Sequence, residues 1–211
     1  MDPIILKIML GLGMLGHALN MYCDYLLSVF PDGKLKISNM KDLNNSQKMS
    51  KLMDGVSEKT PMRSVILGAF ALFLEAFGYF AITANVYQNS HVLGLILFAA
   101  ILLFIVVGTA HHVVCGISEW IYVKLDRSEE AHKAMLALYN GAPSTKVCYL
   151  GYVAFIVTLI VAIGMGLASV PLWMIAFTIL PIFMILAPFK IIGTLHISAM
   201  ISMLVWLIVI S

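Results

Sequence analysis

Long apolar segments make up most of the chain and are separated by two polar loops. A membrane-spanning helix needs about 20 consecutive, mostly apolar residues. Six stretches meet this requirement: residues 4–28, 62–88, 92–123, 147–168, 172–188 and 190–210. The last two are short and closely joined, and Pro181 and Pro188 would kink or end the fifth. Because backbone polar groups find no water in hydrocarbon, each span is predicted to be helical.

The first polar loop, residues 29–61, contains a short amphipathic pattern. Met49, Leu52, Met53 and Val56 follow the i, i+3, i+4, i+7 spacing of one helix face, with lysines between them. Such a helix, with an apolar face and a basic face, is typical of a membrane surface. We therefore expect a short helix that lies on the inner leaflet.

The second polar loop, residues 124–146, contains another helix signal. Asp126 or Ser128 would cap the helix, two glutamates would occupy its first turn, and Asn140-Gly141 would end it. The apolar side of this helix would consist of Ala131, Met135 and Leu138. The two loops thus add short helices to the predicted spans.

Positive charges gather on one side of this arrangement. The chain has 13 Lys and Arg residues, and all except Lys7 lie in the two loops, at the start of the second span or at the connection between the fifth and sixth spans. The positive-inside rule places this side in the cytoplasm. With six spans, both termini are then extracytoplasmic. We expect a plasma-membrane protein of the kind found in the bacterial inner membrane.

The composition supports a membrane protein and excludes some functions. Hydrophobic residues make up 61% of the 211 residues and charged residues 11%, whereas soluble domains have about 25% charged residues. The net charge of +2, without a basic stripe interleaved with aromatic residues, does not indicate nucleic-acid binding. The sequence predicts an all-α integral membrane bundle that forms one polytopic domain over residues 1–211.

The first span also contains a glycine pattern. Gly11, Gly13 and Gly16 form the string G-x-G-x-x-G, which binds dinucleotides only where it follows a strand and opens a helix. Inside an apolar span, small residues instead let two helices approach closely. We therefore interpret these glycines as a helix-packing surface.

Polar side chains occur inside four of the six spans, where an ionised group is costly. His17, Asn20 and Asp24 have the spacing i, i+3, i+7 in the first span and share one face. Glu75 is at the centre of the second span, and His196 is near the inner end of the sixth. These residues lie between the predicted midplane and the cytoplasmic surface.

The third span adds His111 and His112 in the same half of the membrane. Adjacent residues diverge by about 100° on a helix, so only one of the two can face the bundle interior. We favour His112, because Cys115 and Glu119 follow it at i+3 and i+7. The spans together predict a polar cavity in the cytoplasmic half of the bilayer. Its lining would be His17, Asn20, Asp24, Cys115, Glu119 and His196, with Glu75, His112 and His111 as candidate catalytic residues.

Three kinds of function are compatible with such a cavity. A membrane-embedded enzyme would use Glu75 and His112 as acid and base on a lipid-like substrate. A metal-dependent form would bind zinc or iron through His17, His112, His196 and Glu75, although no local ligand spacing supports it, and two of the histidines would suffice for a haem.

The other two kinds of function need no catalysis. A proton-coupled transporter would use Glu75 and the histidines as a relay, but the sequence has no internal repeat, and six spans would need a homodimer. A non-catalytic role, in which the protein binds membrane lipids, a lipid-like small molecule or a protein partner, is slightly favoured by the sequence.

Overall fold

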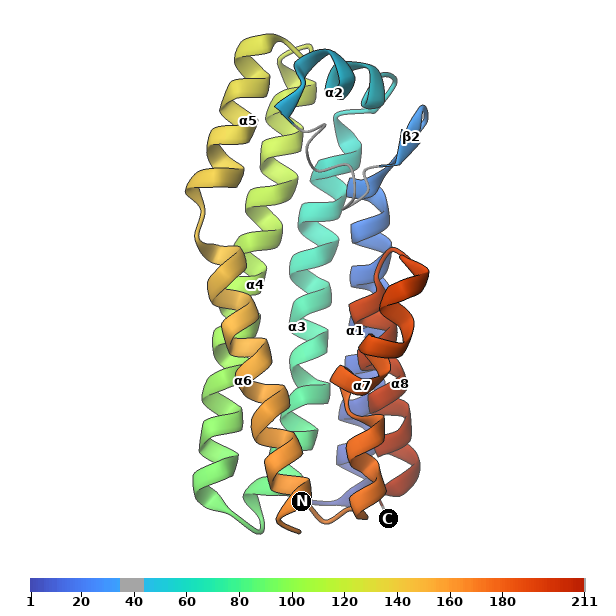
Figure 1. The fold of residues 1–211 in the computed structure, drawn as a ribbon, viewed down its shortest axis with the longest axis vertical. Helices are drawn as coiled ribbons and strands as arrows, with labels where there is room; N and C mark the ends of the chain where they lie inside the picture. Colours follow the sequence, from blue (N-terminus) through green and yellow to red (C-terminus); the bar gives the residue numbers. More distant parts are fainter. Residues whose placement is uncertain (35–43, 211) are drawn as a thin grey trace.

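The computed structural model describes residues 1–34 and 44–210, and in this part of the chain four long apolar helices run side by side (Figure 1). The first three are α1 (Pro3–Ser28), α3 (Lys59–Tyr87) and α4 (His91–Lys124). The fourth is Glu129–Gly164, in which α5 (Glu129–Gly141) leads into α6 (Ser144–Gly164). Each is long and apolar enough to cross a membrane. The protein is therefore all-α, as predicted.

The C-terminal region differs from the predicted pair of full spans. It contains the 3-10 helix η2 (Leu172–Phe177), α7 (Ile179–Leu186), the short turn η3 (Ala187–Phe189) and α8 (Thr194–Val209). The 16 residues of α8 extend over about 24 Å, less than the roughly 30 Å of a hydrocarbon core. Proline residues and the left-handed backbone of Lys190 and Gly193 interrupt the helix. Six spans are therefore not confirmed.

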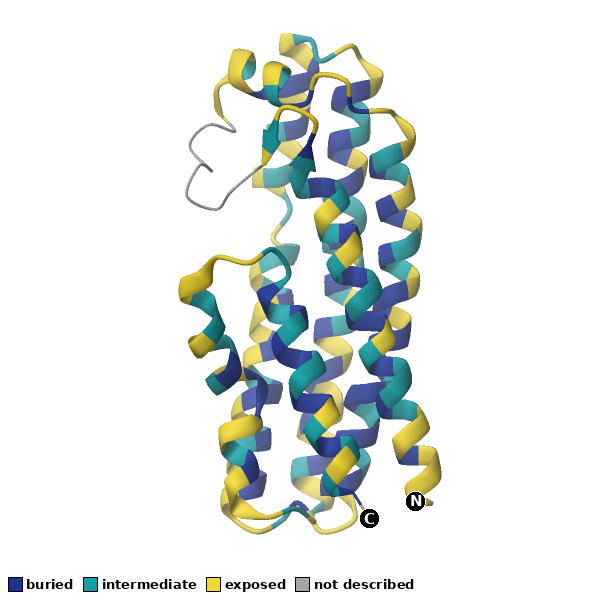
Figure 2. Cartoon of the chain, turned by 90° about the vertical axis from the view of Figure 1, so that its right-hand side faces the viewer, coloured by how far each residue is buried: buried dark blue, intermediate teal, exposed yellow. Residues whose placement is uncertain are grey.

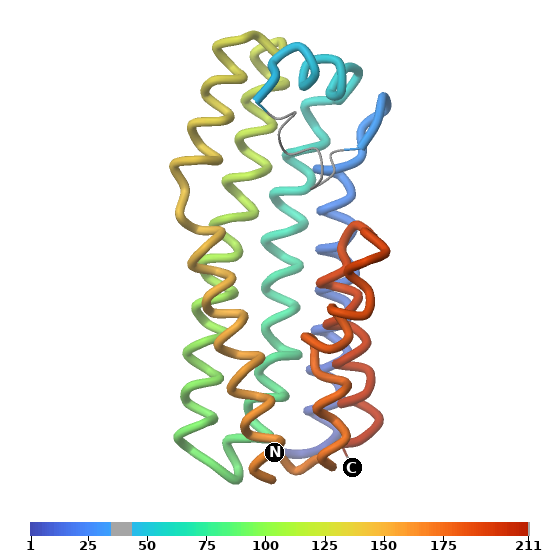
Figure 3. Tube along the Cα trace, in the orientation of Figure 1, coloured from blue at the N-terminus to red at the C-terminus, as the bar shows by residue number. Residues whose placement is uncertain are grey.

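Both ends of the described chain lie at one end of the bundle, and the two polar loops lie mainly at the other (Figure 1). There, β1 (Val29–Phe30) and β2 (Gly33–Lys34) form a small antiparallel pair, and α2 (Ser46–Leu52) crosses over the long helices. The tube in Figure 3 shows α5 and α6 stacked end to end beside α4. Lys36 and Lys41 of the first loop, and the C-terminal Ser211, lie outside the described residues.

The helix α2 packs on the protein rather than on the membrane surface. Met49 and Met53 are almost fully buried, at 2% and 0% exposure, in a second hydrophobic cluster with Tyr122 of α4 and Met135 of α5. Its apolar face is thus covered by the ends of these two helices. The predicted helix is present, but it ends at Leu52, so Met53 and Val56 lie beyond it. Its apolar face is covered by protein and is not free to lie against the inner leaflet as we expected.

The helix predicted in the second loop is confirmed as α5. The hydroxyl of Ser128 accepts a hydrogen bond from the backbone N–H of Ala131 at 3.2 Å, which caps the helix. Ala131 and Met135 are buried as expected, whereas Leu138 is 37% exposed. The helix ends at Gly141, as the Asn140-Gly141 signal predicts.

The outer surface of the long helices is strongly apolar. Figure 2 shows exposed residues on the outside of the helices along most of the bundle. Large side chains on this surface include Ile66 of α3, Val92 of α4 and Leu150 of α6, which are more than half exposed at 65%, 68% and 64%. Apolar surface of this extent is rare on soluble monomers. With the four long apolar helices, it is typical of a membrane protein.

Candidate functional site

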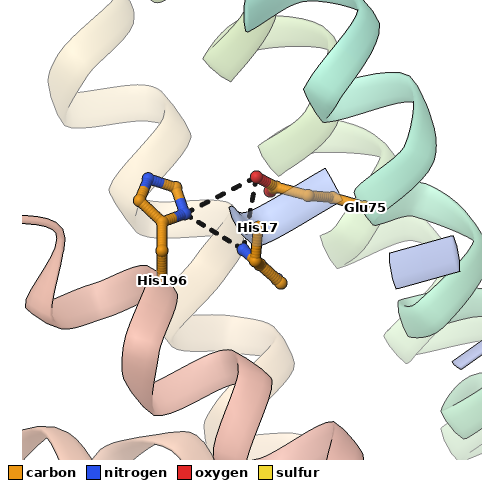
Figure 4. Close-up of side chains that lie close together, drawn as sticks. All are labelled: His17, Glu75 and His196. Carbon is orange, nitrogen blue, oxygen red and sulfur yellow. Dashed lines mark hydrogen bonds and ion pairs between the residues drawn. The ribbon is translucent and has the colours of Figure 1, made fainter. Parts of the chain in front are cut away.

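Three buried side chains from three helices meet inside the bundle (Figure 4). His17 belongs to α1, Glu75 to α3 and His196 to α8. The Nδ1 atoms of the two histidines are 3.0 Å apart. Oε1 of Glu75 lies 3.2 Å from Nδ1 of His17 and 3.5 Å from Nδ1 of His196. Three atoms that carry lone pairs or protons therefore form a nearly equilateral triangle.

Two further polar side chains hold this triangle in place. The Nδ2 amide group of Asn20 donates a hydrogen bond to Oε1 of Glu75 at 2.8 Å. Oδ2 of Asp24 lies 3.3 Å from Nε2 of His196, on the far side of the imidazole. His17, Asn20 and Asp24 thus use the shared face that their spacing predicts. A hydrogen bond from Nε2–H to Asp24 leaves Nδ1 of His196 unprotonated toward the centre.

The site is deeply buried on one side and reaches the surface on the other. Glu75 is 0% exposed and the side chain of His17 is 1% exposed. The side chain of His196 is 11% exposed, and that of Asp24 is 39% exposed. Exposure therefore rises from Glu75 through His196 to Asp24, which connects the buried carboxyl group to the outside.

Glycines in α1 allow the helix to come close enough to α3 to form the site. A Cβ atom on Gly16 would lie 2.5 Å from the backbone nitrogen of Glu75, and one on Gly13 would lie 2.6 Å from Cα of Gly78. Both positions therefore require glycine for backbone contact, as the packing interpretation of the G-x-G-x-x-G string predicts. Gly11 has nothing within 4 Å and plays no part.

Aromatic side chains cover the site on the side that faces the chain termini. The ring of Tyr79, one turn after Glu75, meets the imidazole of His17 edge-on, with centroids 5.5 Å apart. The Tyr79 hydroxyl donates a hydrogen bond to the hydroxyl of Tyr152 from α6 at 3.2 Å. Several buried polar atoms of the described residues lack a hydrogen-bond partner, and three of them belong to this site: Nε2 of His17, Oδ1 of Asn20 and Oε2 of Glu75. Polar contacts in the site are thus incomplete.

The polar residues of α4 lie elsewhere. Nε2 of His112 is 3.1 Å from the backbone oxygen of Ser64 and 3.3 Å from its hydroxyl. Gly68 leaves the space that the His112 ring occupies, since a Cβ atom there would overlap the ring. His112 is buried, at 8% exposure, so it faces the bundle interior as predicted. The partner of His112 is thus Ser64, near the N-terminal end of α3.

His111 points to a different neighbour. Oγ1 of Thr145, at the start of α6, lies 3.0 Å from Nδ1 of His111. Sγ of Cys115 lies 3.6 Å from Nε2 of His111, one turn earlier on the same helix. Cys115 therefore contacts His111, which lies four positions before it, although we expected it to accompany His112. Glu119 is bonded to the Tyr139 hydroxyl of α5 at 3.3 Å.

The predicted acid–base pair is not brought together. His112 contacts Ser64, which precedes Glu75 by eleven positions on α3. At about 1.5 Å per residue, Ser64 and Glu75 are roughly 16 Å apart along α3. The nine candidate residues thus divide into two groups. The first consists of His17, Asn20, Asp24, Glu75 and His196, and the second of His111, His112, Cys115 and Glu119 on α4.

Sequence reasoning missed the uncharged partners of both groups. Tyr79, Ser64 and Tyr139 contact candidate residues, and Tyr152 is hydrogen-bonded to Tyr79. Uncharged side chains of this kind cost too little in a membrane to be singled out from the sequence. Tyr79 had a usable signal, because it lies four positions after Glu75 and therefore on the same helix face. Tyr152 had none, since its role depends on how α6 packs.

The first group has the composition of a metal site. Two imidazole nitrogens and a carboxylate oxygen are suited to zinc and to non-haem iron, and the ligand atoms of His17, Glu75 and His196 all lie within 4.8 Å of one another. Three of the four ligands named for a metal from the sequence are therefore close together. His112, the fourth, is not among them.

Fold and site together define an all-α bundle of long apolar helices with a buried His/Glu/His cluster. The chain belongs to a family described as a family of unknown function (DUF6796), whose model matches residues 1–210. No curated protein and no solved structure matches the chain.

Proposed function

We propose that this protein binds one divalent transition metal ion, zinc or iron(II), within the membrane through His17, Glu75 and His196. The triangle of ligand atoms, with sides of 3.0, 3.2 and 3.5 Å, carries the proposal. Ligands about 2.1 Å from a metal are about 3.0 Å apart at neighbouring octahedral positions and about 3.4 Å apart at tetrahedral ones. Two of the observed sides, 3.0 and 3.2 Å, fall in this range, and the third, 3.5 Å, is slightly longer.

Hydrogen bonds alone account for this triangle less well. An imidazole nitrogen carries either one proton, with which it donates one hydrogen bond, or one lone pair, with which it accepts one. Unbranched hydrogen bonds can therefore satisfy at most two of the three contacts, whereas a metal ion satisfies all three at once. The third contact would place two lone pairs or two N–H groups against each other.

The surrounding residues fit the same proposal. A metal-bound histidine commonly donates its other ring N–H to a carboxylate, and Asp24 is so placed beside His196. Asn20 orients the carboxylate of Glu75. Three protein ligands leave at least one coordination position open, which is typical of sites that bind water or a substrate rather than of closed structural sites.

Metal analysis of the purified protein tests this function. The full chain is purified in detergent, its metal content is measured by inductively coupled plasma mass spectrometry, and Zn²⁺ or Fe²⁺ is added to the metal-depleted protein. We expect about one ion per chain in the wild type and little in Glu75→Gln. His112→Ala is the matched control, since it removes a buried histidine outside the site. Equal metal content in all three proteins, or no binding, contradicts the proposal.

A second candidate function is a proton relay, and the gradient of exposure favours it. The series from Asp24 through His196 to Glu75 connects an exposed carboxylate with a buried one over short contacts. Chains of Asp, Glu and His in membrane proteins carry protons in pumps and transporters. Proton-dependent uptake by vesicles that contain the metal-free protein, abolished in Glu75→Gln, would favour this function over metal binding.

For the arrangement of the chain in the membrane we propose six passes. The grouping of the Lys and Arg residues supports a cytoplasmic location for α2, α5 and the ends of α3 and α4. Both termini are then extracytoplasmic, in the plasma membrane. The last two passes, η2 to η3 and α8, would be shorter than the others, and packing against α1 would compensate for their length.

A further inference from the structure

The start of α3 carries two cations on its outer face, at the level where the apolar surface of the bundle begins. Lys59 and Arg63 are one helical turn apart, and both are exposed. Within residues 1–34 and 44–210 neither has an ion-pair partner, whereas the neighbouring Glu58 is paired with Lys124 at 3.0 Å. Two positive charges on one face are therefore available to an external anion.

Apolar side chains lie directly beside these cations. Lys59 and Arg63 line a hollow of about 480 Å³ together with Met62, Ile66 and Leu67. Ile66 is 65% exposed, so the apolar floor of the hollow is open to the outside. A ligand here would need an anionic part and an apolar part next to each other.

The apolar surface continues along α3 in the same direction. After Arg63, the spacing of Ile66, Phe70 and Phe73 follows a single helix face. Phe70 and Phe73 are 54% and 57% exposed, and their rings stack with centroids 6.3 Å apart. Phe73 lies ten positions after Arg63, which is about 15 Å along the helix, the depth of one leaflet of a hydrocarbon core about 30 Å thick.

We infer that this face of α3 is a binding site for one anionic phospholipid. The phosphate lies between Lys59 and Arg63, and an acyl chain follows Ile66, Phe70 and Phe73 toward the membrane centre. Anionic lipids are enriched in the cytoplasmic leaflet, and paired basic residues at that level bind their headgroups. The site needs the membrane orientation proposed above but does not depend on the metal, so the two proposals can fail separately.

A second copy of the chain fits this face less well. Homodimers most commonly have a two-fold axis, which places the same surface of both copies in contact. A two-fold contact along this stripe with parallel copies would bring four positive charges together without a counterion. Like charges across an interface disfavour it, whereas a lipid phosphate neutralises them.

Native mass spectrometry of the full chain tests the site. The protein in detergent receives phosphatidylglycerol or, as a neutral probe, phosphatidylcholine with the same acyl chains. We expect bound phosphatidylglycerol in excess, and a loss of affinity of about tenfold or more in Lys59→Gln/Arg63→Gln. The variant Lys59→Arg/Arg63→Lys keeps both charges and retains the lipid.

The matched control removes two cations elsewhere at the same end of the bundle. Lys34→Gln/Lys51→Gln, which removes two exposed lysines, has the same net charge as the test variant, so a general attraction to charge lowers lipid binding equally in both. Equal loss overturns the proposal, as does equal binding of the two lipids by the wild type. A change from dimer to monomer in Lys59→Gln/Arg63→Gln would show that a second copy occupies this face, and it also overturns the proposal.

Discussion

The Nδ1 atoms of His17 and His196 lie 3.0 Å apart, although 179 positions separate these residues in the sequence. The first and last helices of the described chain therefore form the same site, and Glu75 from α3 completes it (Figure 4). A ligand common to all three side chains would fasten α8, the shortest of these helices, to the rest of the bundle.

The first prediction concerns the effect of Zn²⁺ on the stability of the fold. Zn²⁺ bound to the wild type stabilises the folded state, and an ion at 100 times its Kd contributes about 2.7 kcal/mol. We expect the midpoint of thermal unfolding to rise with Zn²⁺ in the wild type and to remain constant in His196→Ala. His111→Ala, which removes a histidine of the second group, should respond as the wild type does. An equal rise in His196→Ala would mean that zinc binds elsewhere.

The second prediction concerns Asp24, which orients His196 without touching the centre of the triangle. Removal of such a carboxylate partner costs about 10–100-fold in metal affinity. We expect Asp24→Asn to weaken Zn²⁺ binding by this factor in a competition titration, with the stoichiometry unchanged. Asp54→Asn, an exposed carboxylate in the loop after α2, is the control. If both variants bind like the wild type, Asp24 has no role in the site.

The third prediction compares two glycines of α1. Gly16 lies against the backbone of α3, whereas Gly11 has open space around it. Gly16→Ala forces the helices apart and should lower the free energy of unfolding by about 1–3 kcal/mol, with a loss of metal binding. Gly11→Ala should be neutral or raise it by up to about 1 kcal/mol, because alanine favours a helix. Unfolding in mixed micelles measures both, and a Gly11 effect as large as that of Gly16 would contradict close packing here.

Sequence patterns predicted those features that depend on local spacing. The helix α5 followed from its cap and its end signal, and the shared face of His17, Asn20 and Asp24 followed from helical periodicity. Glu75 could be singled out because an isolated carboxyl group is expensive in a membrane. These are properties of one helix at a time.

Features that depend on the contact between helices could not be predicted. Periodicity gives the face of His112 but not the height at which α4 meets α3, so its contact with Ser64 instead of Glu75 was not foreseen. Hydropathy likewise does not reveal that Lys190 and Gly193 adopt left-handed backbone and divide the C-terminal region. The position of α2 depends on the cluster formed by α4 and α5, which no single segment encodes.

The fourth prediction concerns the C-terminal hairpin. With six passes, the turn between η3 and α8 faces the cytoplasm; with a hairpin that enters and leaves the membrane on one side, it does not. A reporter after Ser211 is extracytoplasmic in both arrangements, so it tests the orientation but not the number of passes. Single cysteines in a chain without the three native ones distinguish the arrangements.

We expect the cysteine of Ile191→Cys to react with a membrane-impermeant maleimide only after the cytoplasmic side is opened, because Ile191 is 47% exposed in this turn. Gln88→Cys, in the exposed turn between α3 and α4, is the control and should react in intact cells. If the cysteine at position 191 also reacts in intact cells, or on neither side, α7 and α8 do not each cross the membrane. His196 would then approach Glu75 from a re-entrant hairpin, and only the four long helices would span the bilayer.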